Sequence, residues 1–135
     1  MTNAVYPKAK ELMLGAGLNL LSATVKVMLV DTASYTYSAA HQYLSDVPAG
    51  ARVGTAQTLG SKSITGGVFD AADATWSGLS GAPSIEALVI YIDTGTESTS
   101  PLVAYIDVAT GLPISSGATG GTVTWDNGAN KILAV

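Results

Sequence analysis

Histidine is the side chain best suited to moving protons near neutral pH, and the chain has one, His41. Nucleophilic catalysis would also need a hydroxyl or thiol beside the ring and a carboxylate to orient it. The nearest carboxylate along the chain is Asp46. A lone histidine is not evidence for a triad, so we expect a structural or interface role for His41, with a pH-sensitive role as the alternative.

Two stretches are rich in oxygen atoms that could bind a cation. Asp70 and Asp73 lie three residues apart, and residues 126–130 read Asp-Asn-Gly-Ala-Asn. The Asp70–Asp73 spacing lacks the alternating ligands and fixed glycine of an EF-hand loop. In residues 126–130, Asp and Asn around a glycine are what a tight turn requires anyway. We therefore expect turns at both places, and we predict no metal, no cofactor and no catalytic residue.

Two glycine-rich stretches, 15–17 and 117–121, resemble nucleotide-binding loops only in composition. The first lacks a third glycine and a preceding strand, and the second lacks the Lys-Ser/Thr ending of a phosphate loop. Both are expected to be ordinary loops.

The element that organises the chain is a predicted hairpin over residues 84–108, in which two β-rich runs flank a polar loop. Alternate residues of a strand lie on opposite faces. The first run then places Ile85, Ala87, Val89 and Tyr91 on one face, and Glu86, Leu88, Ile90 and Ile92 on the other. Since both faces are mostly apolar, we expect a central strand that is covered on both sides by a second sheet, a helix or another copy.

The rest of the chain reads as short strands with two short helices. We expect a helix over 6–14 with Pro7 in its first turn, and a second over 39–44 that is capped by Ser38. Phe69 and Trp76 are expected in the core. The predicted strands cover 25–30, 51–59, 62–68, 122–125 and 131–135, with a turn or bulge at Gly66-Gly67 and a final hairpin at Asn127-Gly128.

These elements predict a mainly β fold, an antiparallel β-sandwich of jelly-roll-like type with one or two short helices. The length fits a single domain over residues 1–135, in which residues 1–5 are expected to form a flexible N-terminal arm.

The surface is expected to carry little charge. Charged residues make up 12% of the chain, against about 25% in typical domains. The net charge is −4 and the six bases are scattered, so we expect no nucleic-acid partner. The apolar runs are far shorter than a membrane span needs, so we expect no membrane partner. Such a surface suits a protein that packs against copies of itself or a large partner.

The candidate interface residues lie in two places. Tyr35, Tyr37, His41, Tyr43 and Leu44 share a short, weakly charged segment, and Ile90 and Ile92 lie in the hairpin. Tyrosine is enriched at interfaces because it offers a large apolar ring with a polar tip. Simple core packing of these rings is an equally weighted alternative.

Four segments, 31–48, 67–76, 86–95 and 125–132, resemble a family of small proteins encoded by tailed bacteriophages. The resemblance implies a non-enzymatic virion protein, made in the host cytoplasm, whose partner is the major capsid protein or a neighbouring virion protein. A head decoration (cement) protein that acts as a homo-oligomer is the leading expectation. A tail, baseplate or fibre-associated adhesion component is the alternative. A small carbohydrate-binding β domain is a further alternative, and it would need exposed aromatic side chains, for which Trp76 and Trp125 are the only tryptophans in the chain.

Overall fold

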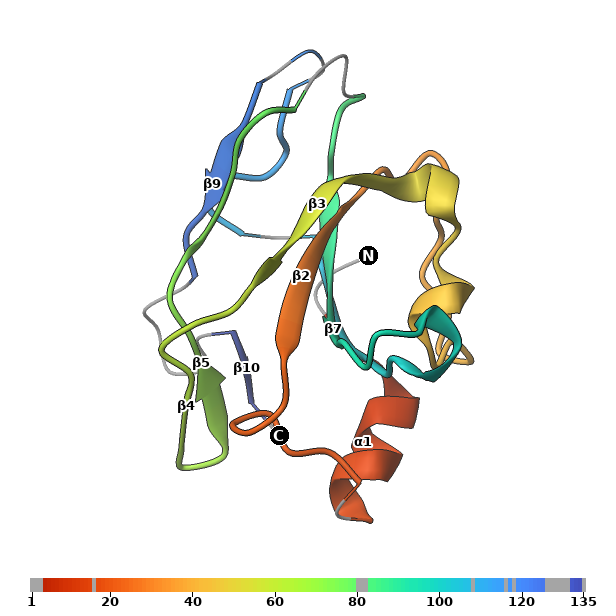
Figure 1. The fold of residues 1–135 in the computed structure, drawn as a ribbon, viewed down its shortest axis with the longest axis vertical. Coiled ribbons are helices and arrows are strands. Elements are labelled where there is room, and N and C mark those ends of the chain that lie inside the picture. The colour runs from red at the N-terminus through yellow and green to blue at the C-terminus, as the bar shows by residue number, and fades with distance from the viewer. Residues whose placement is uncertain are drawn as a thin grey trace.

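A five-stranded antiparallel sheet forms the centre of the fold, in the order β1-β8-β7-β2-β3 (Figure 1). The computed structural model describes residues 4–15, 17–79, 83–107, 109–115, 117, 119–125 and 132–134. The strands of this sheet are β1 (Ala4–Val5), β2 (Val25–Val30), β3 (Arg52–Thr58), β7 (Ala87–Ile92) and β8 (Leu102–Ile106).

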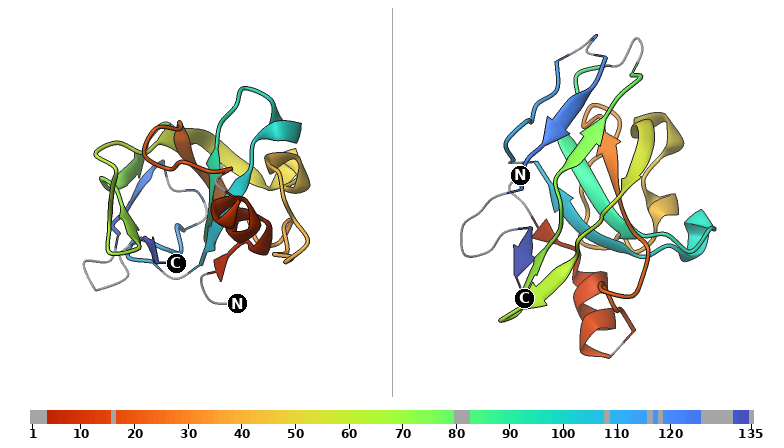
Figure 2. Two further views of the ribbon diagram at one scale, coloured as in Figure 1. Left: turned by 90° about the horizontal axis from the view of Figure 1, so that it is seen from below. Right: turned by 60° about the vertical axis from the view of Figure 1, so that its left-hand side comes forward.

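Two small sheets form a second layer against one face of the central sheet (Figure 2). The three-stranded sheet has the order β10-β5-β4, and the two-stranded sheet pairs β6 with β9. Their strands are β4 (Ser63–Thr65), β5 (Val68–Asp70), β6 (Ala74–Trp76), β9 (Gly121–Val123) and β10 (Leu133–Ala134). Phe69 and Trp76 of this layer pack in one core cluster with Ile90 of the central sheet, so the predicted core positions of Phe69 and Trp76 are confirmed.

The other face of the central sheet is covered by a helix and a long loop. The helix α1 (Pro7–Leu14) and residues 31–47 contribute Ala9, Tyr35 and Val47 to a second core cluster, where they meet Val89 and Tyr91 of β7. The three short 3₁₀ helices of the described residues lie near this side of the molecule (Figure 1): η1 (Leu44–Asp46), η2 (Ala49–Ala51) and η3 (Glu97–Thr99).

Both faces of β7 are therefore buried inside one chain, and all six of its residues are buried. Its neighbour β8 is also buried throughout. Ala104 pairs with Ile90 and Leu102 with Tyr91, so Val103 is an extra residue that bulges out of the register. The prediction that the hairpin is central and covered on both sides is confirmed. The covers are the two small sheets on one face and α1 with its neighbouring loop on the other.

The mainly β, antiparallel, sandwich-like fold with a short helix is also as predicted. The helix begins with Pro7 and ends at Leu14, before Gly15. Gly66 and Gly67 have φ values of 59° and 79° and join β4 to β5. Two consecutive residues at positive φ make the tight hairpin turn that glycine favours.

The predicted second helix over 39–44 is wrong. Ser38 does accept a hydrogen bond at its hydroxyl from the N–H of Ala40, but only a turn follows. The N–H of Leu44 donates to the carbonyl of Ser100, and the N–H of Leu102 donates to the carbonyl of Gln42, both at 2.9 Å. These bonds hold the backbone extended along the start of β8, so only Leu44–Asp46 forms a helical turn.

The predicted hairpin at the C-terminus is also wrong. β9 pairs with β6 and β10 pairs with β5, so the strands on either side of the predicted turn belong to different sheets. The Asn127-Gly128 turn itself lies outside the described residues. At the N-terminus, residues 4 and 5 of the predicted arm are instead strand β1, paired with β8, while residues 1–3 lie outside the described part.

We expect Ile90→Ala to lower the free energy of unfolding by about 2–5 kcal/mol, because truncation in a packed core leaves a cavity. Ile90 is 0% exposed, whereas Leu14 is 88% exposed. Leu14→Ala is the control and should change stability by less than about 0.5 kcal/mol. Urea unfolding followed by tryptophan fluorescence measures both, and equal effects would contradict the burial of β7.

Candidate functional site: a tyrosine and histidine cluster

A chain of hydrogen bonds links α1 to the loop that covers the sheet. Tyr6, the residue that precedes α1, places its hydroxyl 2.7 Å from the hydroxyl of Tyr35. The hydroxyl of Tyr35 lies 2.8 Å from Nδ1 of His41. Tyr6 is 0% exposed and Tyr35 is 3% exposed, so this chain runs from the core outward to a half-buried histidine.

Aromatic rings from separate parts of the sequence pack around this chain. The ring of Tyr37 has its centre 5.1 Å from that of Tyr6 and 5.4 Å from that of Tyr105 in β8. Tyr35 lies 6.2 Å from Tyr105 and 5.4 Å from His41, ring centre to ring centre. Tilted ring pairs at these distances stabilise a fold beyond the area that they bury. The cluster therefore joins α1, the 31–47 loop and the central sheet.

The buried phenols of the cluster stay protonated at neutral pH. Burial is the main cause that raises the pKa of Tyr35 to about 12, and burial raises the pKa of Tyr6 further still. Burial also raises the pKa of Tyr105. When Tyr6 donates to Tyr35 and Tyr35 donates to Nδ1 of His41, each hydroxyl proton has an acceptor. The arrangement is a satisfied buried network that fixes the loop.

Asp46 fixes the backbone next to His41. Its carboxylate accepts hydrogen bonds from the N–H groups of Gln42 at 2.8 Å and Tyr43 at 3.1 Å. The bond from Gln42 is the largest cause that lowers the pKa of Asp46, and the bond from Tyr43 and the charge of His41 add to it against an opposing effect of burial.

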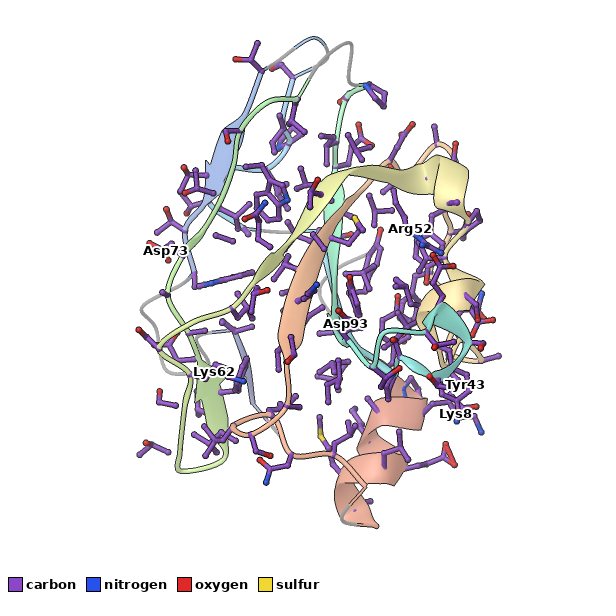
Figure 3. The ribbon with its side chains drawn as sticks, in the orientation of Figure 1. Lys8, Tyr43, Arg52, Lys62, Asp73 and Asp93 are labelled. Carbon is purple, nitrogen blue, oxygen red and sulfur yellow. The ribbon has the colours of Figure 1, made fainter. Side chains whose placement is uncertain are left out.

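Arg52 holds the far end of the same loop. Its guanidinium donates to the carbonyls of Val47 and Leu44, and it pairs with Glu97 in η3 at 2.6 Å. The hydrogen bond from Arg52 is the main cause that lowers the pKa of Glu97. Figure 3 shows Arg52 and Tyr43 on the side of the molecule that also carries Lys8 of α1. The loop is thus fixed by Asp46 and Arg52 as well as by the cluster.

The predicted interface residues divide into two groups. Tyr35, Tyr37 and His41 come together in the cluster, and Tyr43 and Leu44 follow directly along the chain. Tyr35 and Leu44 are only 3% and 6% exposed, so Tyr37, His41 and Tyr43 are the partly accessible members.

The positions of Ile90 and Ile92 do not agree with the prediction that they lie at an interface. They lie in the core cluster on the opposite face of the sheet, at 0% and 8% exposure. The small sheets of the same chain cover that face, so these side chains contact the core rather than a partner.

Sequence reasoning missed Tyr6 and Tyr105. Tyr6 reaches the cluster because β1 pairs with β8, where Ala4 lies opposite Tyr105. A two-residue strand has no period that a sequence pattern can reveal. The one available signal was the alternation in the hairpin, which places Tyr105 on a defined face of β8.

The two tryptophans are buried, Trp76 at 2% and Trp125 at 5% exposure. The indole N–H of Trp125 donates to the carbonyl of Ala72 at 2.9 Å. A carbohydrate-binding face built on exposed tryptophan is therefore absent from the described residues. Asp73 accepts a hydrogen bond from the N–H of Trp125 at 3.0 Å, which is a structural role in joining β6 to the end of β9.

Within the described ranges, no group of three His, Cys, Asp or Glu side chains is placed to hold a metal ion. Residues 126–130, the other oxygen-rich stretch, lie outside those ranges. In the same part of the chain, no helix combines the length and the apolar character needed to cross a membrane. No protein-family model matches the sequence, and no curated protein matches it.

We expect Tyr35→Phe to lower the free energy of unfolding by about 1–3 kcal/mol, because it leaves the buried hydroxyl of Tyr6 without this partner. Tyr37→Phe is the matched control, since it keeps the ring contacts and leaves the hydrogen-bond chain intact. Its effect should stay below about 0.5 kcal/mol. Urea unfolding measures both variants. If Tyr35→Phe lowers the free energy of unfolding no more than its control does, the Tyr6–Tyr35–His41 hydrogen bonds do not contribute to stability.

Acidification should weaken the fold through Asp46. Its pKa is lower in the folded chain than in the unfolded chain, so its contribution is present at neutral pH and is lost as the pH falls below about 4. Asp46→Ala should cost about 0.5–1 kcal/mol at neutral pH and less at about pH 3.

Asp46→Asn keeps an oxygen acceptor but does not titrate, and it serves as the control. Its stability relative to Asp46→Ala should not vary with pH when both are followed by urea unfolding. A constant difference between the wild type and Asp46→Asn across this range would contradict the lowered pKa.

Proposed function

We propose that the chain is a non-enzymatic structural protein of a tailed-phage virion that decorates the head and stabilises the shell by binding the major capsid protein. The resemblance of four segments to small phage proteins supports the proposal. The structural observation that carries it is the nature of the surface, which is weakly charged and offers no accessible tryptophan in the described part.

Ion pairs reduce the charge that the surface presents. Lys8 pairs with Glu11 at 3.3 Å, Lys26 with Asp93 at 2.9 Å and Arg52 with Glu97 at 2.6 Å. Half of the six bases are therefore neutralised by a carboxylate of the same chain. Many of the other exposed residues are Ser, Thr, Gly and Ala.

An uncharged surface of this kind suits attachment to a lattice. Little like-charge repulsion opposes the approach of a large partner, and few charged side chains need to be desolvated when the two surfaces bind. Each contact can then be weak, because many linked contacts on a repeated shell add up to tight attachment.

Copies of the chain would associate through accessible groups. Both strands of the apolar hairpin are buried within the chain, so the hairpin does not supply an interface. Tyr37, His41 and Tyr43 are half-buried and offer aromatic area with polar tips, which is what an interface between copies uses. We place the proposed homo-oligomer contact there.

The test is the mass of the purified chain by light scattering, followed by its binding to empty shells of the major capsid protein from the same phage genome. We expect a discrete oligomer, or saturable binding at a fixed ratio of the chain to the capsid protein. A stable monomer that does not bind shells would overturn head decoration and favour the tail or fibre alternative. Binding to purified tail proteins would then test that alternative.

A further inference from the structure

The three large hydrophobic side chains that are exposed in the described part of the chain occur at one end of the molecule. Leu14 is 88% exposed, Leu21 49% and Ile64 45%. Leu14 ends α1, Leu21 lies in the loop before β2, and Ile64 lies in β4. Figure 1 and the right-hand view of Figure 2 show these elements at the same end. We call α1, residues 17–24 and residues 61–67 together the lysine end.

Specific contacts hold the lysine end together. Nζ of Lys62, beside β4, donates to the carbonyl of Ala23 in the loop. The N–H of Gly17 donates to the carbonyl of Leu12 in α1 at 2.6 Å. The side-chain oxygen of Asn19 accepts from the N–H of Leu21 at 3.1 Å and shapes the turn that exposes Leu21. The hydrophobic side chains thus stand on a structured surface.

The lysine end also differs in charge from the rest of the chain. It contains Lys8, Lys10 and Lys62 and one acid, Glu11, which makes its formal charge +2. Since the whole chain carries −4, the remainder carries −6. A cationic surface with apolar side chains is complementary to an acidic surface that has an apolar contact point.

A second copy of the chain does not fit this surface. A two-fold contact between two lysine ends would bring like charges together. A head-to-tail contact would satisfy the charges, but no other large hydrophobic side chain in the described residues is exposed to meet Leu14. The lysine end is therefore better complemented by a different protein surface that is acidic and apolar.

We propose that the lysine end is the surface that docks on the shell, and that it contacts an acidic patch with an apolar centre on the outer face of the major capsid protein. This inference rests on the proposed function and assigns it a binding face. Leu14 supplies the largest exposed apolar contact, and the exposed Lys10 supplies charge next to it on α1.

The experiment is cosedimentation of the chain with empty shells of the major capsid protein, for the wild type, Leu14→Ser, Lys10→Gln and Ser98→Asp. Leu14→Ser should weaken binding about tenfold or more, the effect of losing one good apolar contact. At low NaCl, Lys10→Gln should bind the shells more weakly than the wild type does. At high NaCl the difference between the two proteins should be smaller, because salt screens exposed charges.

Ser98→Asp is the matched control, because it changes the net charge by the same unit as Lys10→Gln but lies in η3, outside the lysine end. It should bind as the wild type does. Equal binding by all four proteins would overturn the docking face and leave head decoration standing. No binding by the wild type would overturn head decoration and this inference with it. A change in the oligomeric mass of free Leu14→Ser would show that a second copy occupies the lysine end, and would overturn the assignment of the partner.

Discussion

The burial of both faces of β7 is the constraint on which the rest of the structure depends. A strand with apolar side chains on both sides must be covered twice before it is removed from water. The chain achieves this with two unlike layers, small sheets on one face and a helix with a long loop on the other. Because its own chain covers the most apolar element, any partner has to bind at loops, helix surfaces or strand edges.

The loop cover is unusual because polar bonds hold much of it. A helix or sheet brings its own backbone hydrogen bonds, but the 31–47 segment must find partners for its polar groups elsewhere. The Tyr6–Tyr35–His41 chain, the carboxylate of Asp46 and the guanidinium of Arg52 provide them. The same groups leave Tyr37, His41 and Tyr43 half-accessible, so the stability of the cover and the proposed contact between copies involve one set of side chains.

Local patterns predicted the elements whose signals are local. The alternation over 85–92 revealed a central strand, and Pro7 and Gly15 marked the ends of α1. The C-terminal hairpin failed because Asn-Gly is only a local turn signal, whereas β9 and β10 find partners far along the sequence in β6 and β5. For the same reason the sequence revealed the half of the aromatic cluster that lies within residues 35–41. It could not reveal the half that the pairing of β1 with β8 brings in.

That pairing has a consequence for the order in which the chain can fold. β1 and α1 leave the ribosome well before β7 and β8, but Ala4 lies opposite Tyr105, and β2 pairs with β7 as well as with β3. Contacts between distant segments form slowly because a long loop must close first. The pairing of β1, and the pairing of β2 on its β7 side, therefore cannot form until β7 and β8 have been synthesised. During that interval the low fraction of charged residues gives the nascent chain little protection against aggregation.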